Sequence, residues 1–131
     1  MNALVTIPTY NEAENITPLV QGLLALDVQV DVIIVDDNSP DGTGAIADDR
    51  ARASNRVHVL HRPRKMGLGS AHIAGFMYGL EKGASSVITM DADFSHPVSA
   101  IAPLVRSMDA YDVMIGSRYI PAGKIVNWTL D

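Results

Sequence analysis

The sequence predicts an α/β domain in three layers, α/β/α, in which a mostly parallel sheet is covered by helices on both faces. Strand-like and helix-like segments alternate along the chain, which is typical of right-handed βαβ units. Residues 32–35 form a continuous apolar run rich in β-branched side chains, as expected of a strand buried on both faces. Polar motifs follow the strand-like segments directly, at the ends where parallel sheets bind ligands.

Five segments have the composition of strands. In chain order they are residues 3–7, 32–35, 56–60, 86–89 and 111–115. Helical patterns lie between them, at residues 16–24, 41–53, 68–82 and 97–108. Two starts remain open for the first helix. Asn11 and Glu14 could form a capping box, or Thr17 could cap a helix whose first residue is Pro18.

The third helical segment combines two kinds of residue. Large apolar side chains form its apolar side, at Ile73, Phe76, Met77 and Leu80. Small residues recur at every fourth position, at Ala71, Gly75 and Gly79. Each glycine inside a helix costs up to about 1 kcal/mol, so we expect this helix to pack closely against its neighbours.

The composition is that of one globular domain spanning residues 1–131, with 47% hydrophobic and 19% charged residues. No apolar run approaches the roughly 20 residues of a membrane span, and we expect no secretory signal. The absence of cysteine excludes disulfides and thiolate chemistry and favours a cytoplasmic location. A net charge of −5 argues against general nucleic-acid binding.

The most informative motif is the acidic segment that follows the fourth expected strand. In extended backbone, side chains two residues apart point the same way, so Asp91 and Asp93 would face one space. Two neighbouring carboxylates need a cation between them, or one of them stays protonated. A divalent metal completed by phosphate oxygens is one solution. The alternative is that one aspartate caps the next helix and the other is solvated.

Several common nucleotide-binding motifs are missing. The first turn lacks G-x-G-x-x-G, and the chain contains no P-loop. Gly67-Leu68-Gly69 at the start of a helix offers amides to an anion, although glycine for packing explains it equally well. The pair Asp36 and Asp37 is similar to the acidic pocket of a phosphorelay receiver, but it follows the second strand and not the first.

Five segments in order are P-T-Y-N-E, V-D-D-N-S-P-D-G-T, G-L-G-S-A, M-D-A-D-F-S-H-P and G-S-R-Y. Together they resemble the inverting family 2 glycosyltransferases of the GT-A fold, and most closely the dolichol- and polyprenol-phosphate mannose synthases. The resemblance runs from about residue 3 to Trp128. Its second and fourth segments are the most specific.

The resemblance implies roles on the nucleotide side. Pro8, Tyr10 and Glu12 would line the nucleotide pocket, and Val35 and Asp37 would contact the base and ribose. Loop packing is the alternative for Tyr10, and charge complementarity at a helix N-terminus is the alternative for Glu12. The preceding Asp36 we expect to be structural, bonding loop amides.

The resemblance also implies a metal and phosphate site. Asp91, Ala92 and Asp93 would lie at the diphosphate, where Asp91 and Asp93, with Ser95 as a further ligand, would hold Mg²⁺ or Mn²⁺. Asp93 and Arg118 are the expected catalytic residues. The planar fork of Arg118 suits a phosphate, and a surface salt bridge is its alternative.

Other polar residues have more ordinary explanations. Arg62, Arg64 and Lys65 are expected to form a solvated basic loop. His72 is expected to pack within its helix, and His96 to be part of the structure at a helix start.

The implied activity is transfer of a hexosyl group, mannosyl by resemblance, from GDP-mannose to a polyprenyl or dolichyl phosphate, with inversion. The family continues past Asn127-Trp128, so we expect this chain to hold the donor part and to be truncated on the acceptor side. Membrane contact, at a cytoplasmic face, would then be peripheral and through the missing part. Three alternatives remain: a nucleotide-sugar-binding module without turnover, a family 2 transferase using another donor such as UDP-glucose, and a receiver-like regulatory domain.

Overall fold

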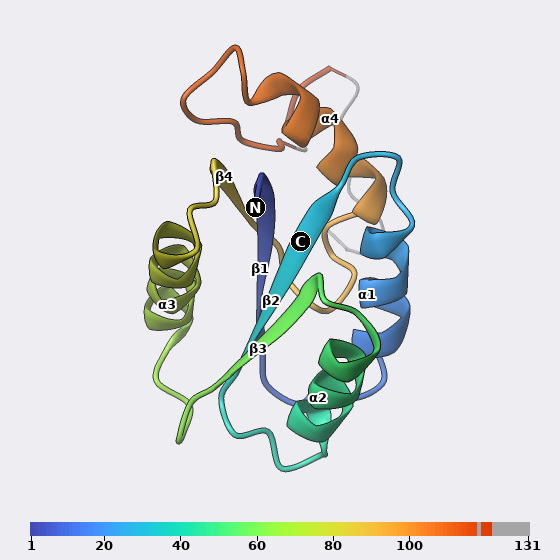
Figure 1. Ribbon diagram of the computed structural model, residues 1–131, viewed down its shortest axis with the longest axis vertical. Helices are drawn as coiled ribbons and strands as arrows, with labels where there is room; N and C mark the ends of the chain where they lie inside the picture. The colour runs from blue at the N-terminus through green and yellow to red at the C-terminus, as the bar shows by residue number, and fades with distance from the viewer. Residues whose placement is uncertain (118, 122–131) are drawn as a thin grey trace, which may run out of the picture.

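The computed structural model describes residues 1–117 and 119–121. Its centre is a parallel sheet of four strands in the order β3-β2-β1-β4 (Figure 1). The strands are β1 (Ala3–Thr9), β2 (Val30–Asp36), β3 (Val57–His61) and β4 (Ser86–Thr89). This arrangement confirms the predicted α/β class and the first four expected strands.

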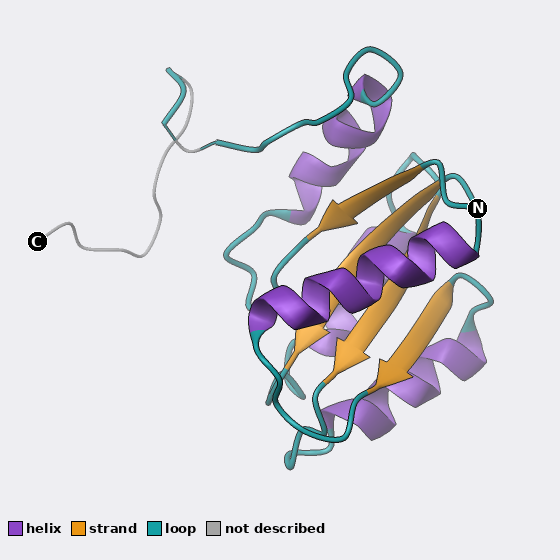
Figure 2. Cartoon of the chain, turned by 90° about the vertical axis from the view of Figure 1, so that its left-hand side faces the viewer, coloured by secondary structure: helices purple, strands orange, loops and turns teal. Residues whose placement is uncertain are grey.

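Helices cover both faces of the sheet. They are α1 (Ile16–Leu24), α2 (Thr43–Ala53), α3 (Leu68–Glu81) and α4 (Ile101–Ser107), the last preceded by the short 3₁₀ helix η1 (Val98–Ala100). Helices α1 and α2 lie on one face, and α3 lies on the other (Figures 1 and 2). None of the helices within the described ranges is long and apolar enough to cross a membrane.

The alternation of side chains along the central strands divides the core into two parts. Val32 and Ile34 of β2 face α1 and α2, whereas Ile33 and Val35 face α3. All four are fully buried. The uninterrupted apolar run of β2 therefore follows from its place at the centre of a sheet that is covered on both sides.

Helix α3 packs on the sheet through its small residues. A Cβ atom added to Gly75 would overlap the side chain of Thr6, and one added to Gly79 would come within 2.8 Å of Val87 Cγ2. This confirms the close approach predicted from the glycine spacing. It also turns the large apolar side chains of α3 away from the sheet, and Ile73 and Leu80 are 60% and 71% exposed.

Two sequence-based expectations differ from the structure. Residues 111–115 do not form a strand. Val113 is 76% exposed, and no described segment pairs with the free edge of β4. A β-prone composition needs a neighbouring strand to be realised. Helix α1 spans residues 16–24 as predicted, but its N-cap is Asn15, which is neither of the two expected caps. Pro18 lies in its first turn, where its missing N–H has no intrahelical partner anyway.

The strand order creates a switch point beside β1. The chain moves from β1 to β2 and β3 in one direction, and then returns to place β4 on the other side of β1. In open parallel sheets, ligands bind beyond the carboxyl ends of the strands at such a point. The loops after β1, β2 and β4 therefore meet at the edge where a ligand site is expected.

Candidate functional site

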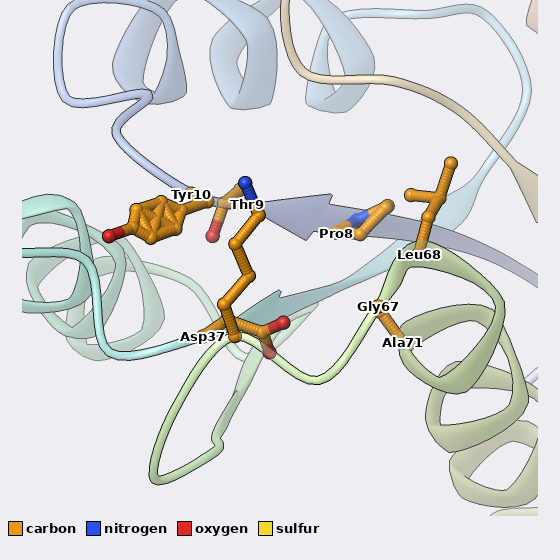
Figure 3. Close-up of a pocket in the computed structure, with 8 residues that line it drawn as sticks. Pro8, Thr9, Tyr10, Asp37, Gly67, Leu68 and Ala71 are labelled. Atoms are coloured by element: carbon orange, nitrogen blue, oxygen red, sulfur yellow. The ribbon is translucent and has the colours of Figure 1, made fainter.

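A pocket of about 110 Å³ opens at the carboxyl ends of β1 and β2 (Figure 3). Its walls come from the end of β1, the residue after β2, the loop before α3 and the first turn of that helix. The lining residues are Pro8, Thr9, Tyr10, Asp37, Lys65, Gly67, Leu68 and Ala71. The structure thus brings together three of the residues predicted for the nucleotide, namely Pro8, Tyr10 and Asp37.

Two other predicted nucleotide residues lie outside this lining. Val35 is fully buried in the core beneath α3. Glu12 lies at the entrance to α1, where its carboxylate accepts a hydrogen bond from Asn15 Nδ2 (2.9 Å) and its backbone N–H donates to Thr43 Oγ1 (3.0 Å). These contacts tie the loop after β1 to the start of α2.

Asp37 is held at the pocket wall by a two-bond ion pair with Arg62. Arg62 Nε lies 2.6 Å from Asp37 Oδ1, and Arg62 Nη2 lies 2.8 Å from Oδ2. The two side chains are only 8% and 10% exposed. The hydrogen bonds from Arg62 hold the pKa of Asp37 below its usual value, although burial acts in the opposite direction. The expectation that Arg62 lies in a solvated loop was therefore wrong.

The origin of this pair is the register of the sheet. The pairing of β2 with β3 puts Asp36 opposite His61, so the next residues, Asp37 and Arg62, leave the sheet side by side. Strand order and register are not visible in the sequence, which explains why sequence reasoning missed Arg62. The fork geometry of arginine matches both oxygens of a carboxylate.

Arg62 also joins Asp37 to the beginning of α3. Arg62 Nη1 donates to Ser70 Oγ, and Arg62 Nη2 donates to the Gly67 carbonyl (3.4 Å). Asp37 Oδ2 in turn accepts the backbone N–H of Met66 (3.4 Å). Gly67 has a φ of +91°, a left-handed conformation that a glycine adopts without strain. The G-L-G motif thus forms part of the pocket wall.

The other two basic residues of this loop are exposed, as expected, but Lys65 also takes part in the pocket. Its Nζ lies 4.7 Å from the centre of the Tyr10 ring, within the range of a cation–π interaction. The Tyr10 ring is partly exposed. A ring held in this way offers a face on which a planar ligand could stack.

Asp36 has the structural role predicted for it. Its carboxylate accepts hydrogen bonds from Thr9 Oγ1 (2.7 Å), Ser39 N (3.1 Å) and Ser39 Oγ (2.7 Å). Because Asp36 is almost fully buried, these bonds compensate the cost of burying its charge. They fix the loop after β2 against the end of β1.

The acidic segment forms a tight loop at the end of β4. Ala92 is buried in the core, and its neighbours Asp91 and Asp93 lie towards the surface. The backbone N–H of Ser95 donates to Asp93 Oδ1 (3.0 Å), and hydrogen bonds from Ser95 lower the pKa of Asp93. His96 Nδ1 accepts the N–H of Asp91 (3.1 Å). His96 is thus structural, as expected, but it closes the acidic loop.

All three loops contain a strained residue. Among the described residues, the non-glycine positions with positive φ are Asn11 (58°), Asn38 (54°) and Phe94 (63°). They follow β1, β2 and β4 respectively. Such conformations persist only where the surroundings impose them, and they concentrate at ligand sites. This clustering supports one functional edge made of three loops.

The donor atoms of the acidic loop fit a hard divalent cation whose shell is completed from outside. No group of three or more His, Cys, Asp or Glu side chains suited to a metal occurs within the described ranges. Mg²⁺ commonly uses one or two carboxylates and takes its remaining ligands from phosphates and water. Asp91 and Asp93 could supply those carboxylates, and Ser95 lies beside Asp93. Arg118 lies outside the described residues.

His72 belongs to α3, where its ring stacks on Phe76 with 6.5 Å between the ring centres. This contact within the helix agrees with the expectation from the sequence.

Comparison with known proteins gives the family. The protein-family model described as glycosyl transferase family 2 matches residues 4–131 of the sequence. A polyprenol monophosphomannose synthase from Mycolicibacterium smegmatis is 50% identical over 127 residues, which are 95% of this chain and 48% of that protein. An undecaprenyl-phosphate mannosyltransferase from Micrococcus luteus is 51% identical over 129 residues, which are 98% of this chain and 53% of that protein. The chain spans about half the length of these curated relatives.

A solved structure shares the fold. The mannosyltransferase PcManGT from Pyrobaculum calidifontis, in complex with GDP-Man and Mn²⁺, matches with a TM-score of 0.54 at 23% identity, over 59% of this chain and 24% of that chain. At this identity the likeness concerns the architecture alone, which agrees with the GT-A-like fold expected from the sequence. On the strength of the family match along almost its whole length, the chain belongs to glycosyl transferase family 2.

Proposed function

We propose that this chain is the donor-binding part of a transferase that moves a mannosyl group from GDP-mannose to a polyprenyl phosphate. The observation that carries the proposal is that almost all of this chain is 50% and 51% identical to a polyprenol monophosphomannose synthase and an undecaprenyl-phosphate mannosyltransferase. That span includes the pocket and the acidic loop. The geometry supports the proposal, because the pocket and the acidic loop both lie beside β1 at the switch point of the sheet.

The nucleoside would occupy the pocket between Tyr10 and Asp37. The Tyr10 ring could stack on the base with one face, while the Lys65 ammonium lies over the ring. A carboxylate has about four lone-pair sites. The bonds from Arg62 and Met66 occupy three of them in Asp37, which leaves room for a ring N–H or a ribose hydroxyl.

The diphosphate would then reach the acidic loop. Asp91 and Asp93 would hold Mg²⁺ or Mn²⁺, which would neutralise the charge of the leaving diphosphate. Asp93 is an ionised carboxylate at neutral pH, and hydrogen bonds from Ser95 lower its pKa further. The hydrogen bond that the backbone N–H of Ser95 donates would orient the carboxylate of Asp93.

The acceptor chemistry needs no general base from the protein. A phosphate monoester is already largely anionic near neutral pH. Its oxygen would attack the anomeric carbon opposite the leaving group, so that the configuration inverts. Arg118 would hold a phosphate at the reacting centre, because its planar fork can bind two oxygens at once.

Calorimetry with and without Mn²⁺ tests the donor half of this proposal. We expect GDP-mannose to bind more tightly than UDP-glucose, and only weakly without the metal. Equal affinity for the two donors would remove the GDP-mannose assignment, and binding that ignores the metal would remove the role of the acidic loop.

Asp93→Ala provides the matched variant for this experiment. Asp93 is exposed but accepts the backbone N–H of Ser95, so we expect the variant to fold and its free energy of unfolding to fall by about 1 kcal/mol. The metal-dependent part of GDP binding should be lost in the same variant. Asp109→Ala, at an exposed aspartate beyond α4, is the control that should bind as the original chain does.

A further inference from the structure

Lys65 brings a positive charge to the candidate pocket that no carboxylate of the described residues neutralises. Its side chain lines the pocket, and its Nζ lies 4.7 Å from the centre of the Tyr10 ring. It forms no ion pair with a residue in the described ranges. A surface lysine usually keeps its charged head in water. The ammonium of Lys65 lies instead at the pocket, where a ligand would meet it.

The backbone on both sides of Lys65 is tied to the loop after β2. Asn38 Nδ2 donates a hydrogen bond to the Pro63 carbonyl (3.2 Å), and the Met66 N–H donates to Asp37 Oδ2 (3.4 Å). These bonds hold the loop before α3 at the pocket wall. The flexible four-carbon stem of Lys65 still allows the ammonium to change its position within the pocket.

Asp37 provides an acceptor close to this ammonium. Among the described residues, its Oδ2 accepts from Arg62 Nη2 and Met66 N, whereas its Oδ1 accepts from Arg62 Nε alone. Each carboxylate oxygen has about two lone-pair sites, so Oδ1 keeps one for a ligand. The hydrogen bonds from Arg62 lower the pKa of Asp37 most, and the positive charge of Lys65 lowers it further. The pocket thus offers a charged donor and a free acceptor near each other.

The place of Lys65 in the sheet separates it from the expected diphosphate. Lys65 follows β3 and the acidic loop follows β4, and these are the two outermost strands of the described sheet. At the usual spacing of neighbouring strands, their ends lie roughly 14 Å apart. A donor whose diphosphate meets the acidic loop therefore presents its base, and not its phosphates, to Lys65.

We propose that Lys65 and Asp37 together read the edge of the nucleobase and select a base in which a ring N–H lies beside a carbonyl group. The Lys65 ammonium donates to the carbonyl oxygen, and Asp37 Oδ1 accepts the ring N–H, while the base stacks on Tyr10. A base on the ring face that the ammonium covers displaces it, and the stem lets it move to the edge of the base. The inference rests on the proposed function, because it requires a nucleotide in this pocket.

The pattern of donor and acceptor distinguishes the bases. Guanine and uracil carry a ring N–H beside a carbonyl, whereas adenine and cytosine carry a bare ring nitrogen beside an amino group. In the orientation proposed for guanine, adenine would turn its amino group towards the ammonium and its ring nitrogen towards the carboxylate. Sites that pair with the polar groups of a ligand strongly reject analogues that leave those site groups unpaired. The pocket should therefore prefer GDP to ADP.

Calorimetry of the full 131-residue chain with GDP and with ADP, each with Mn²⁺, tests the proposal. We expect the original chain to bind GDP more tightly than ADP. Lys65→Met keeps the length of the stem but removes the charge. It should lower the affinity for GDP about tenfold or more, with little change for ADP. Lys65→Arg keeps a charged donor and should retain most of the preference.

Arg64→Met is the matched control. It removes the same charge from the neighbouring exposed position, which does not line the pocket, so the ratio of GDP affinity to ADP affinity should stay as in the original chain. Because Lys65 is also exposed, all three variants should unfold at about the same urea concentration as the original chain.

An unchanged ratio in Lys65→Met would overturn the proposal, and so would an original chain that binds neither nucleotide. Equal losses for GDP and ADP would place the ammonium at the phosphates. GDP-mannose titrations with and without Mn²⁺ separate this inference from the proposed function. If the ratio does not depend on Lys65 but GDP-mannose binding needs the metal, the base reading is wrong and the donor assignment stands. If Lys65 controls the ratio but the metal has no effect, the base reading stands without the proposed function.

Discussion

At the scale of single residues, one ion pair carries much of the site. Arg62 holds Asp37 through two short hydrogen bonds, and the pair also contacts Ser70 and the backbone of Met66 and Gly67. The loop after β2 is thus fixed to the beginning of α3. The net contribution of a buried ion pair to stability is small, but removing one partner destabilises the fold strongly because the other charge stays buried without compensation.

Replacing Arg62 should therefore destabilise the fold. Because Arg62→Ala leaves the Asp37 carboxylate buried without its main partner, we expect the free energy of unfolding to fall by about 3 kcal/mol or more in urea. Arg64→Ala, two residues away and exposed, is the matched control and should change it by less than about 0.5 kcal/mol. Similar values for the two variants would contradict the importance of the pair.

The ion pair between Asp37 and Arg62 makes the free energy of unfolding depend on pH. The pKa of Asp37 lies below its ordinary value of 3.8 in the folded chain, so the unfolded chain takes up this proton first as the pH falls. The contribution of Asp37 is then complete above about pH 5 and is lost as the pH falls through 3.8 towards the lower native pKa. Urea titrations across this pH range should show the loss, and in Arg62→Ala the free energy of unfolding should depend less steeply on pH. An unchanged slope in that variant would mean that another group is responsible.

Sequence reasoning at this scale succeeded where a role depends on neighbouring residues. Asp36 was expected to bond loop amides, and it does so with Ser39, three positions along the chain. Arg62 was missed because its partner is 25 residues away and is brought to it by the register of two strands. The pattern of charges gave no sign of that register.

At the scale of elements, α3 departs most from the usual helix. Its fourfold spacing of small residues was readable from the sequence and is the contact with the sheet. Which side of the helix then faced the core was not readable, because the large apolar residues and the small ones both suggested burial. The structure resolves this in favour of the small residues, since only they allow the backbone to approach Thr6 and Val87.

Two glycines of α3 provide a matched test of this packing. A Cβ at Gly75 overlaps Thr6, so Gly75→Ala should lower the free energy of unfolding by about 1–3 kcal/mol. A Cβ at Gly69 meets nothing within 4 Å. Gly69→Ala should therefore leave stability unchanged or raise it by up to about 1 kcal/mol. Thermal and urea unfolding of both variants would check this, and a stable Gly75→Ala would show that α3 does not pack as described.

The segment at residues 111–115 was predicted to be a strand and is not one. Its composition was typical of a strand, and the sequence gave no way to see that a described neighbour would be lacking. A strand is defined by its hydrogen-bonding partners, which a local pattern does not supply.

At the scale of the whole molecule, strand order is what assembles the site. Alternating strand and helix patterns predicted a parallel sheet with polar motifs at the ends of its strands. The structure confirms this for the motifs after β1, β2 and β4, whereas the segment before G-S-R-Y forms no strand. The order β3-β2-β1-β4 then puts the pocket and the acidic loop on either side of the end of β1. The positive-φ residues Asn11, Asn38 and Phe94 lie in the three loops of that same edge.

The central claim is that one donor spans this edge, with its nucleoside at Tyr10 and Asp37 and its diphosphate at the acidic loop. Amide NMR of the chain with GDP-mannose, first with Mg²⁺ and then with Mn²⁺, tests it most directly. We predict shifts at residues 9–11, 37 and 65–71 with Mg²⁺, and selective paramagnetic broadening at residues 91–96 with Mn²⁺. Broadening centred elsewhere, or donor-induced shifts that leave the first set untouched, would contradict the account.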